Sequence, residues 1–457
     1  MTWLHPRRDV CGAEDGEAPK RSQKRRLGFV VAALTLVAGV AAGSGALLAP
    51  VSASGGPLVI ADLAPFSGPD AALGGYYYAA CLGATKAMNQ DGGVLGHQLT
   101  CKTFDTRGDP ADAVPATNQM FASTSNLALV IGCTSDEAAS VVPIINSKKM
   151  VVFGMTGQSE FDHVKYPYFF RLVPPDLAES YAMVAIAKYH KHYKKIALAF
   201  GNDIGSQTFV KPAVQAIKKA GLKLAANVTL DLTATTFRTE AEEVVESHPD
   251  VILTEALGAT DATFLSEVKQ LNGGKMIPVI GTSATIDPSW FSSVSAAIGA
   301  STLASHYVAD NLVVATSGPE FRPFDNAMKA VKSQVKSDDA GSLETLLSGP
   351  GAVHLFDGMN LAALAMIMAK STTPSVYKAD ITKIGDGVKG AVVVHSFAQG
   401  KKELAKGKAI RYVGPGGPTN FDAYHDSPGI LQIDGYKTNG AVTVVGGIST
   451  AQLRAVS

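Results

Sequence analysis

The sequence predicts an α/β protein made of two Rossmann-like lobes, each with a central, mainly parallel sheet. Short apolar runs alternate with longer stretches of helical periodicity from Leu58 onward, as expected of repeated β-α units. The run Leu127–Ile131 is apolar at every position, which is typical of a parallel strand covered on both faces. A chain of 457 residues is also too long for one ordinary core and fits two domains.

Composition and the motifs that are missing exclude several function classes. Lys and Arg number 40, as do Asp and Glu, so no basic face for nucleic acid is indicated. The sequence contains no GxxxxGK[ST], GxSxG or HExxH motif, and no GxGxxG that opens a helix after a strand. His190 and His192 lie two positions apart and do not share a helix face, which argues against a metal site. We therefore expect neither an enzyme nor a cofactor.

The N-terminal segment has the order of a secretory signal peptide. Basic residues at 20–26 precede an apolar run, 27–49, and Val51-Ser52-Ala53 is a small-x-small cleavage site. The prediction is a signal peptide over 1–53, with an uncleaved membrane anchor as the alternative because the apolar run is long. Without it the chain keeps 33 Lys and Arg against 36 Asp and Glu, a formal net charge of −3.

Three cysteines remain beyond that segment: Cys81, Cys101 and Cys133. Export leads to an oxidising compartment, so we expect one disulfide and one buried thiol. The spacing does not say which two residues pair.

The first lobe should begin with a strand-loop-helix-strand unit over Leu58–Leu99. Its loop follows the carboxyl end of a strand, where ligands sit in open α/β sheets. The next strands end in small or hydroxyl residues, Gly132–Ser135 and Gly154–Gly157, which directs backbone N–H groups and hydroxyls to one sheet edge. The further elements expected here are strands over 99–104, 127–131 and 150–153 and helices over 110–124 and 136–146.

A second set of the same units follows Pro174-Pro175, which neither a helix nor a central strand accommodates. We expect this to be the first crossing between lobes, with a return near Ser305–Val308. The closing segments Ile430–Tyr436 and Ala441–Val445 form a predicted hairpin around Asn439-Gly440. The other elements expected are strands over 195–200, 223–230, 251–253 and 278–281 and helices over 209–220, 236–247, 260–271, 321–335 and 353–370.

Several segments together resemble a known family. The most specific are Phe66-Ser67-Gly68-Pro69 with Gly74 and Ala84, then 89–96, 104–110, Val130-Ile131-Gly132 with Ser135, 414–418 and Phe421-Asp422. Their order and spacing are similar to those of the extracellular solute-binding proteins of ABC importers, in the leucine/isoleucine/valine-binding (type I periplasmic binding protein) family. The resemblance covers essentially all of the chain after the signal segment.

This resemblance implies a ligand site between the lobes. Hydroxyl and amide groups for a ligand carboxylate would fall at Thr134, Ser135, Met155 and Thr156. The other implied site residues are Leu73 in the first lobe, Ile204, Leu257, Gly258, Ser283 and Ala284 in the second, and Phe356 near the hinge. The family's acid for the ligand ammonium should lie near Ser283-Ala284, where this sequence has none, so Glu255 or Asp261 is the expected replacement, with a helix-cap role as the alternative for both.

The family implies two lobes joined by a three-segment hinge, as in a Venus flytrap. Lobe 1 would span 57–172 plus 309–415, and lobe 2 would span 173–308 plus 416–457. The expected function is capture of a small polar solute, a branched-chain or related amino acid, and delivery to an ABC permease by an exported, monomeric protein without metal or cofactor. The alternatives are a sensor or receptor module of the same fold and an exported hydrolase.

Overall fold

The computed structural model describes residues 56–335, 347, 351–427 and 429–457 of the chain. The predicted signal peptide, 1–53, lies outside the described residues. Each lobe is built around its own sheet, and the two sheets share no strand.

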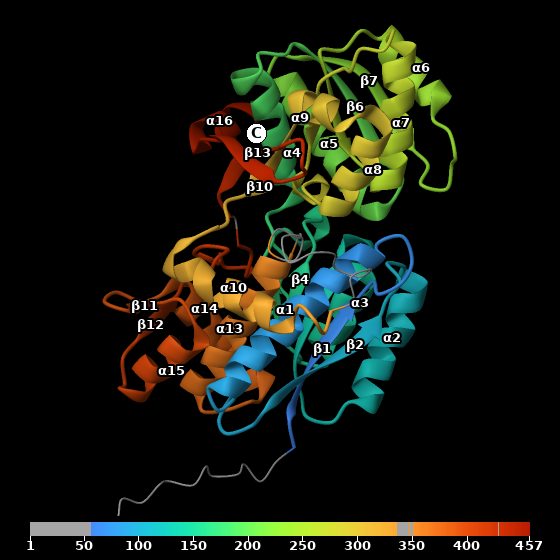
Figure 1. The fold of residues 1–457 in the computed structure, drawn as a ribbon. Helices are drawn as coiled ribbons and strands as arrows, with labels where there is room; N and C mark the ends of the chain where they lie inside the picture. Colours follow the sequence, from blue (N-terminus) through green and yellow to red (C-terminus); the bar gives the residue numbers. More distant parts are fainter. Residues whose placement is uncertain (1–55, 336–346, 348–350, 428) are drawn as a thin grey trace, which may run out of the picture. The chain divides into compact units, whose positions relative to one another are not determined.

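The first lobe contains a five-stranded parallel sheet in the order β2-β1-β3-β4-β5 (Figure 1). One face is covered by α1 and by the later helices α10, α13 and α14, and the other by α2 and α3. The elements are β1 (Leu58–Ala64), α1 (Ala71–Gln90), β2 (Leu99–Asp105), α2 (Pro110–Ser123), β3 (Leu127–Thr134), α3 (Ser135–Ser147), β4 (Val152–Met155) and β5 (Phe169–Arg171).

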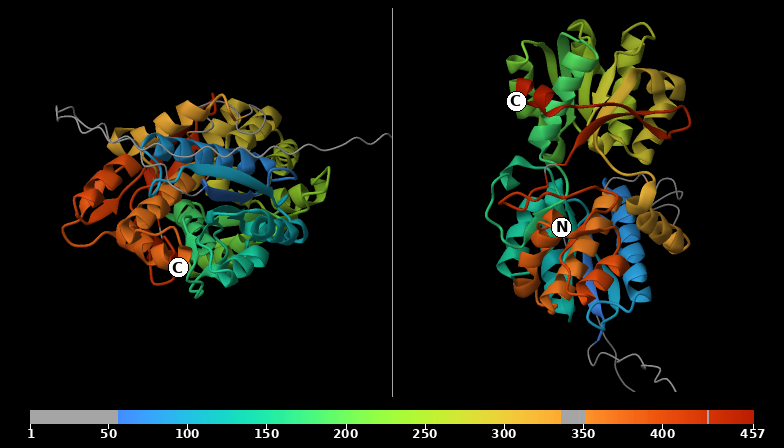
Figure 2. Two further views of the ribbon diagram at one scale, coloured as in Figure 1. Left: turned by 90° about the horizontal axis from the view of Figure 1, so that it is seen from below. Right: turned by 90° about the vertical axis from the view of Figure 1, so that its left-hand side faces the viewer.

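The second lobe contains a seven-stranded sheet in the order β14-β13-β10-β9-β8-β6-β7. The five strands from β10 to β7 are parallel, and the predicted C-terminal hairpin adds two antiparallel strands (red in Figure 2). Helices α4, α5 and α16 cover one face, and α6, α7 and α8 cover the other. The elements are α4 (Asp176–Ala185), β6 (Lys195–Gly201), α5 (Ile204–Lys219), β7 (Lys223–Leu230), α6 (Arg238–Glu246), β8 (Val251–Glu255), α7 (Gly258–Leu271), β9 (Val279–Gly281), α8 (Pro288–Ile298), α9 (Ala300–His306), β10 (Tyr307–Leu312), β13 (Leu431–Tyr436), β14 (Val442–Gly447) and α16 (Thr450–Val456).

The chain returns to the first lobe after β10 and adds a mainly helical layer. Helix α13 is apolar and long enough to cross a membrane, but 78% of its apolar window is buried, as expected of a core helix. The added elements are α10 (Gly318–Val331), α13 (Ala352–Ala369), α14 (Pro374–Asp386), β11 (Val392–Val394), α15 (Phe397–Ala405) and β12 (Ile410–Tyr412).

Two predicted lobe boundaries need correction. The boundary at 309 cuts β10, which pairs with β9 on one side and with β13 on the other and so belongs wholly to the second sheet. The boundary at 416 also falls too early, because Gly416 donates its N–H to Asp357 of α13 and Asp426 binds Arg171 of β5. The last crossing therefore follows Asp426, directly before β13.

A disulfide joins Cys81 of α1 to Cys101 of β2, and Cys133 is a buried free thiol. This confirms the expectation of one disulfide and one thiol and answers the question of pairing that the spacing left open. The bond links a helix to an edge strand of the first sheet.

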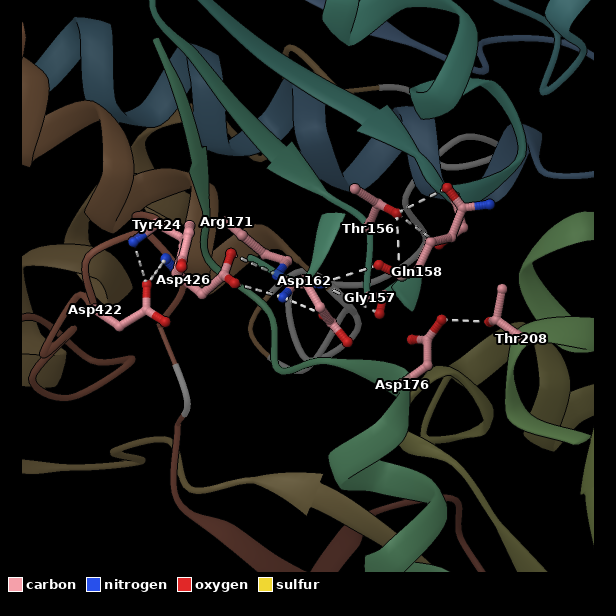
Figure 3. Close-up of polar contacts among 11 residues, drawn as sticks. Thr156, Gly157, Gln158, Asp162, Arg171, Asp176, Thr208, Asp422, Tyr424 and Asp426 are labelled. Carbon is pink, nitrogen blue, oxygen red and sulfur yellow. Dashed lines mark hydrogen bonds and ion pairs between the residues drawn. The ribbon is translucent and has the colours of Figure 1, made fainter. Parts of the chain in front are cut away.

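Arg171 at the end of β5 is fully buried and ties two crossing segments together (Figure 3). Its Nε and Nη2 donate to the two carboxylate oxygens of Asp426 at 2.9 and 2.8 Å, and Nη2 also reaches Asp162 at 2.6 Å. Nη1 contacts the carbonyl oxygens of Gly157 and Gln158 at 3.3 and 3.2 Å. A buried guanidinium needs this full set of acceptors, because a buried charge without partners is very costly.

Replacing Asp426 with alanine should leave the Arg171 charge only partly compensated. We expect Asp426→Ala to lower the free energy of unfolding by about 3–5 kcal/mol, measured by urea denaturation. The control is Asp112→Ala, which breaks an ion pair with Arg107 whose side chains are 54% and 60% exposed. That variant should lose less than about 1 kcal/mol. Equal losses in the two variants would contradict a structural role for the buried pair.

Candidate functional site

The predicted site residues stand where parallel strands end. Thr134 ends β3 and Met155 ends β4 in the first lobe, while Glu255 ends β8 in the second. Apart from Phe356, the remaining residues lie in the turns and first helical turns that follow the ends of parallel strands. This is the sheet edge at which open α/β folds bind ligands.

The loop that opens the first lobe is organised by one carboxylate. Asp105 accepts the backbone N–H of Phe66, Ser67 and Arg107 at 2.9, 3.2 and 2.9 Å and the Ser67 hydroxyl at 2.6 Å. Gly68 adopts φ +88°, and a Cβ there would lie 2.5 Å from the Arg107 carbonyl oxygen. The loop before α1 is thus held by the strand end of β2, with half-buried Leu73 following in the first turn of α1.

Ser135 and Thr156 are brought together as predicted. Ser135 is the first residue of α3, and its hydroxyl donates to the Thr156 hydroxyl at 3.3 Å. Thr156 in turn contacts the side-chain carbonyl of Gln158, also at 3.3 Å, and accepts that residue's backbone N–H. The backbone carbonyls of the next two residues are the ones that Arg171 holds, so the ion pair at the crossing also positions Thr156 (Figure 3).

Thr134 and Met155 serve the fold of the first lobe. Thr134 is the N-cap of α3 and forms a capping box with Glu137, donating both its hydroxyl and its N–H to that carboxylate. Its hydroxyl is therefore already used within the protein, which corrects its predicted role in the carboxylate nest. The Thr-x-x-Glu spacing of a capping box was readable in the sequence. Met155 is buried, with its methyl group close to Tyr77 and Gly351.

Phe356 does not belong to this sheet edge. It is 2% exposed in α13, with its ring centroid 5.4 Å from that of Phe324 in α10. It lines a separate cavity of about 480 Å³ between α1, α10 and α15, together with Gly83 and Lys86. The aromatic residue expected near the hinge is thus a core residue of the first lobe.

In the second lobe the predicted residues frame the ends of β8 and β9. Ile204 opens α5 and is 48% exposed, Leu257 is the N-cap of α7, and Ala284 is exposed. Gly258 is required by packing, because a Cβ there would lie 2.9 Å from the Cα of Trp290. Ser283 donates both its N–H and its hydroxyl to Glu179.

The structure gives different roles to the two acids, Glu255 and Asp261, that were expected to replace the family's acid for the ligand ammonium group. Asp261 is buried and accepts from the Trp290 indole and the Thr254 hydroxyl, both at 2.9 Å, which makes it a structural residue of α7. Burial raises the pKa of Asp261 to about 7. Glu255 is half-buried at the end of β8 and accepts the Thr282 hydroxyl. Glu255 is therefore the acid that remains at the sheet edge.

Side chains of α1 and α3 form hydrogen bonds to helix N-termini of the second lobe. The Asp136 carboxylate in the first turn of α3 accepts the N–H of Gly205 in the first turn of α5 at 2.9 Å. A Cβ on Gly205 would lie 3.3 Å from the Ser135 Cβ, so a glycine suits this approach of the two helices. The second bond runs from the Tyr76 hydroxyl in α1 to Asp287, the N-cap of α8, at 2.8 Å. These residues were not predicted, because each pair joins segments distant in the chain.

Asp136 also accepts a hydrogen bond from Asp70, the N-cap of α1. Burial, followed by the charges of Asp136, Asp203 and Glu137, raises the pKa of Asp70 to about 8. At neutral pH Asp70 therefore keeps its proton and donates it to Asp136. Three helix N-termini, those of α1, α3 and α5, meet around these acids, and their dipoles favour the negative charge that remains.

No group of three or more His, Cys, Asp or Glu side chains within 56–335, 351–427 and 429–457 has the geometry of a metal site. The acids of this region instead contact hydroxyl groups, backbone N–H groups and one another.

Comparison with known proteins agrees with this arrangement. The sequence profile of the periplasmic binding protein family matches residues 57–347. The chain belongs to the periplasmic binding protein family. Members of this family are extracytoplasmic solute-binding proteins rather than enzymes, and no curated protein matches this member in sequence.

Solved structures show the same type I periplasmic binding protein fold at low identity. The leucine-binding protein LivK of Thermotoga maritima is 16% identical, with a TM-score of 0.67 over 86% of this chain and 99% of its own. The branched-chain amino acid transporter substrate-binding protein LivJ of Streptococcus pneumoniae, solved with isoleucine, is 17% identical. Its TM-score is 0.67, and the match covers 85% of this chain and 99% of LivJ. A fatty acid ABC transporter substrate-binding protein of Thermomonospora curvata is 16% identical. Its TM-score is 0.67, and the match covers 88% of this chain and 95% of that protein.

The raised pKa of Asp70 predicts how stability depends on pH. A carboxyl group with a higher pKa in the folded protein stabilises the fold fully at acid pH, and this stabilisation disappears as the pH rises from about 4 to about 8. Asp70→Asn keeps a donor toward Asp136 but has no proton to lose. The substitution should therefore remove a fall in the free energy of unfolding of at most about 1.4 kcal/mol per pH unit.

The measurement is urea denaturation of both proteins at several pH values between 5 and 8. The stability of Asp70→Asn relative to the unchanged protein should increase steadily with pH. Asp136, Asp203 and Glu137, the other acids that face this group, are present in both proteins. Parallel stability curves would contradict the assignment.

Proposed function

We propose that this periplasmic binding protein captures a small polar solute, a branched-chain or related α-amino acid, between its lobes and delivers it to an ABC permease. The single observation that carries the proposal is the pairing of opposite chemistries at the two facing sheet edges. Hydroxyls and a helix N-terminus stand at the first edge and a carboxylate at the second. No covalent step is required of the protein.

The first-lobe edge suits a ligand carboxylate. Ser135 opens α3 and Thr156 follows β4, and their hydroxyls lie 3.3 Å apart. Thr156 is buried and donates its own hydroxyl to Gln158, so it positions Ser135. Ser135 and the backbone N–H groups of the first turn of α3, which have no partner within the helix, are the proposed donors. Hydrogen bonds from such donors to an ionised carboxylate are stronger than bonds between neutral groups.

The second-lobe edge suits an ammonium group and an aliphatic side chain. Glu255 is half-buried, and its oxygens are able to accept the donors of an ammonium group. Leu73, Ile204 and Leu257 add apolar surface around the same edges and are only partly buried or exposed. An α-amino acid combines these three requirements in one small molecule.

Delivery to a permease requires a difference between bound and free forms that the permease recognises. The inter-lobe bonds of Asp136 and Tyr76 are suited to this role, because they form only when the lobes approach. We further propose that segment 1–53 directs export, followed by either cleavage or retention as a membrane anchor, and that the protein acts as a monomer.

Loss of the two hydroxyls should abolish binding. A thermal-shift series with leucine, isoleucine, valine, amides, urea and small carboxylates should identify at least one stabilising solute. At a concentration about 100 times its Kd, a solute contributes about 2.7 kcal/mol, which raises the Tm by several degrees. Ser135→Ala combined with Thr156→Ala should remove this shift while the protein remains folded.

The matched control is Ser147→Ala combined with Thr263→Ala. Both hydroxyls bond only to carbonyl groups of their own helices, and Ser147 lies at the opposite end of α3 from Ser135. This control should keep the full shift. Retained binding in the Ser135/Thr156 variant, or turnover of any solute, would refute the proposal.

A further inference from the structure

Three carboxyl side chains gather at the ligand-facing edge of the second sheet. In the parallel register, Gly281 pairs with Thr254 on one side and with Ala309 on the other. The next residues, Glu255, Thr282 and Asp310, therefore form one row across the adjacent strands β8, β9 and β10. Neighbours in a row of parallel strands point to the same face of the sheet. Glu255 and Asp310 consequently flank Thr282 on one face.

The third carboxyl group, Glu179, approaches this row from α4. Its two oxygens accept the backbone N–H and the hydroxyl of Ser283, each at 3.1 Å. The same side chain lies within hydrogen-bonding reach of Asp310. Thr282 and Ser283 thus stand at the centre of three acids from β8, β10 and α4.

Asp310 has no donor of its own. It is 0% exposed, and no donor from another described residue reaches either of its carboxylate oxygens. Its neighbour Glu179 is also a carboxyl group, so the two form a hydrogen bond only while they share a proton. Burial raises the pKa of Asp310, and its own backbone N–H and the proton shared with Glu179 are the partners that the described residues give its carboxyl group.

The charged groups nearest the cluster are acidic as well. Asp176 and Asp203 act on Glu255, and both lie in or next to the first turns of α4 and α5. Arg171 is the basic side chain of this region, and its donors are directed to Asp426, Asp162 and two carbonyl groups. The described residues therefore bring several carboxyl groups to this edge without a free cation, and burial raises the pKa of Glu179, Glu255 and Asp310.

We infer that the solute carries a second positive charge, an amine or guanidinium group, which Glu179 and Asp310 bind beside Glu255. This rests on the proposed function and keeps its α-amino acid, but it replaces the neutral branched side chain with a cationic one. One ammonium group matches Glu255, and the second cation supplies the donors that Asp310 lacks. The arrangement does not match a metal site, which favours an organic cation.

The test compares each cationic amino acid with a neutral counterpart of similar shape by isothermal titration calorimetry. The pairs are L-lysine with L-norleucine and L-arginine with L-citrulline. The cationic member of at least one pair should bind about tenfold more tightly or better, the factor that corresponds to about 1.4 kcal/mol.

Two variants assign the preference to these residues. Asp310→Asn and Glu179→Gln keep the side-chain shape and remove one negative charge each, so the preference for the cationic member should fall to less than about threefold. Asp112→Asn, at an exposed position in the first lobe, should keep the full preference. Asp310→Asn should also keep or raise the Tm, because it removes an uncompensated buried carboxyl group.

The outcomes separate the two proposals. If neutral amino acids bind as tightly as their cationic counterparts, the inference of a second positive charge on the solute is wrong and the proposed function is unaffected. An unchanged preference in folded Asp310→Asn and Glu179→Gln would overturn the assigned residues. Failure of every amino acid to bind would overturn the proposed function and this inference together.

Discussion

The ion pair between Arg171 and Asp426 is the contact on which the first-lobe side of the candidate site depends. It joins the end of β5, where the chain first leaves the first lobe, to the segment from which the chain leaves it for the last time. The same guanidinium holds the carbonyl groups that follow Thr156. One buried cation therefore sets both the crossing segments and the hydroxyl-bearing turn. Its acceptors are numerous because a buried charge is tolerated only when its donors are satisfied.

Helix N-termini explain why so many acids are stable near the sheet edges. Asp70, Asp136, Asp176 and Glu179 are caps or first-turn residues of α1, α3 and α4. The partial positive charge of a helix N-terminus favours a carboxylate at these positions. This accounts for individual acids but not for the pair of Glu179 and Asp310, since Asp310 lies in a strand. A strand acid without donors has no such compensation, and it distinguishes the second-lobe edge from an ordinary set of helix caps.

Much of the fold follows from local sequence patterns. Apolar runs such as Leu127–Ile131, the helix over 353–370 that is apolar on most faces and the Asn439-Gly440 turn each depend on residues close together in the chain. The pairing of Ser135 with Thr156 was also predictable, because hydroxyl residues that follow neighbouring parallel strands meet at one edge. The lobe boundary after Asp426 was missed, since the Gly- and Pro-rich stretch that precedes it resembles a crossing.

The sequence by itself determined the α/β class, the order of most strands and helices, and the placement of Ser135 and Thr156 at one sheet edge. Only the tertiary structure decided the pairing of Cys81 with Cys101, the structural roles of Thr134, Asp261 and Phe356, and the meeting of Glu179 with Asp310. The physical reason is distance along the chain. Periodicity and capping act over a few residues, whereas Arg171 and Asp426 lie 255 residues apart and are brought together only by the tertiary fold.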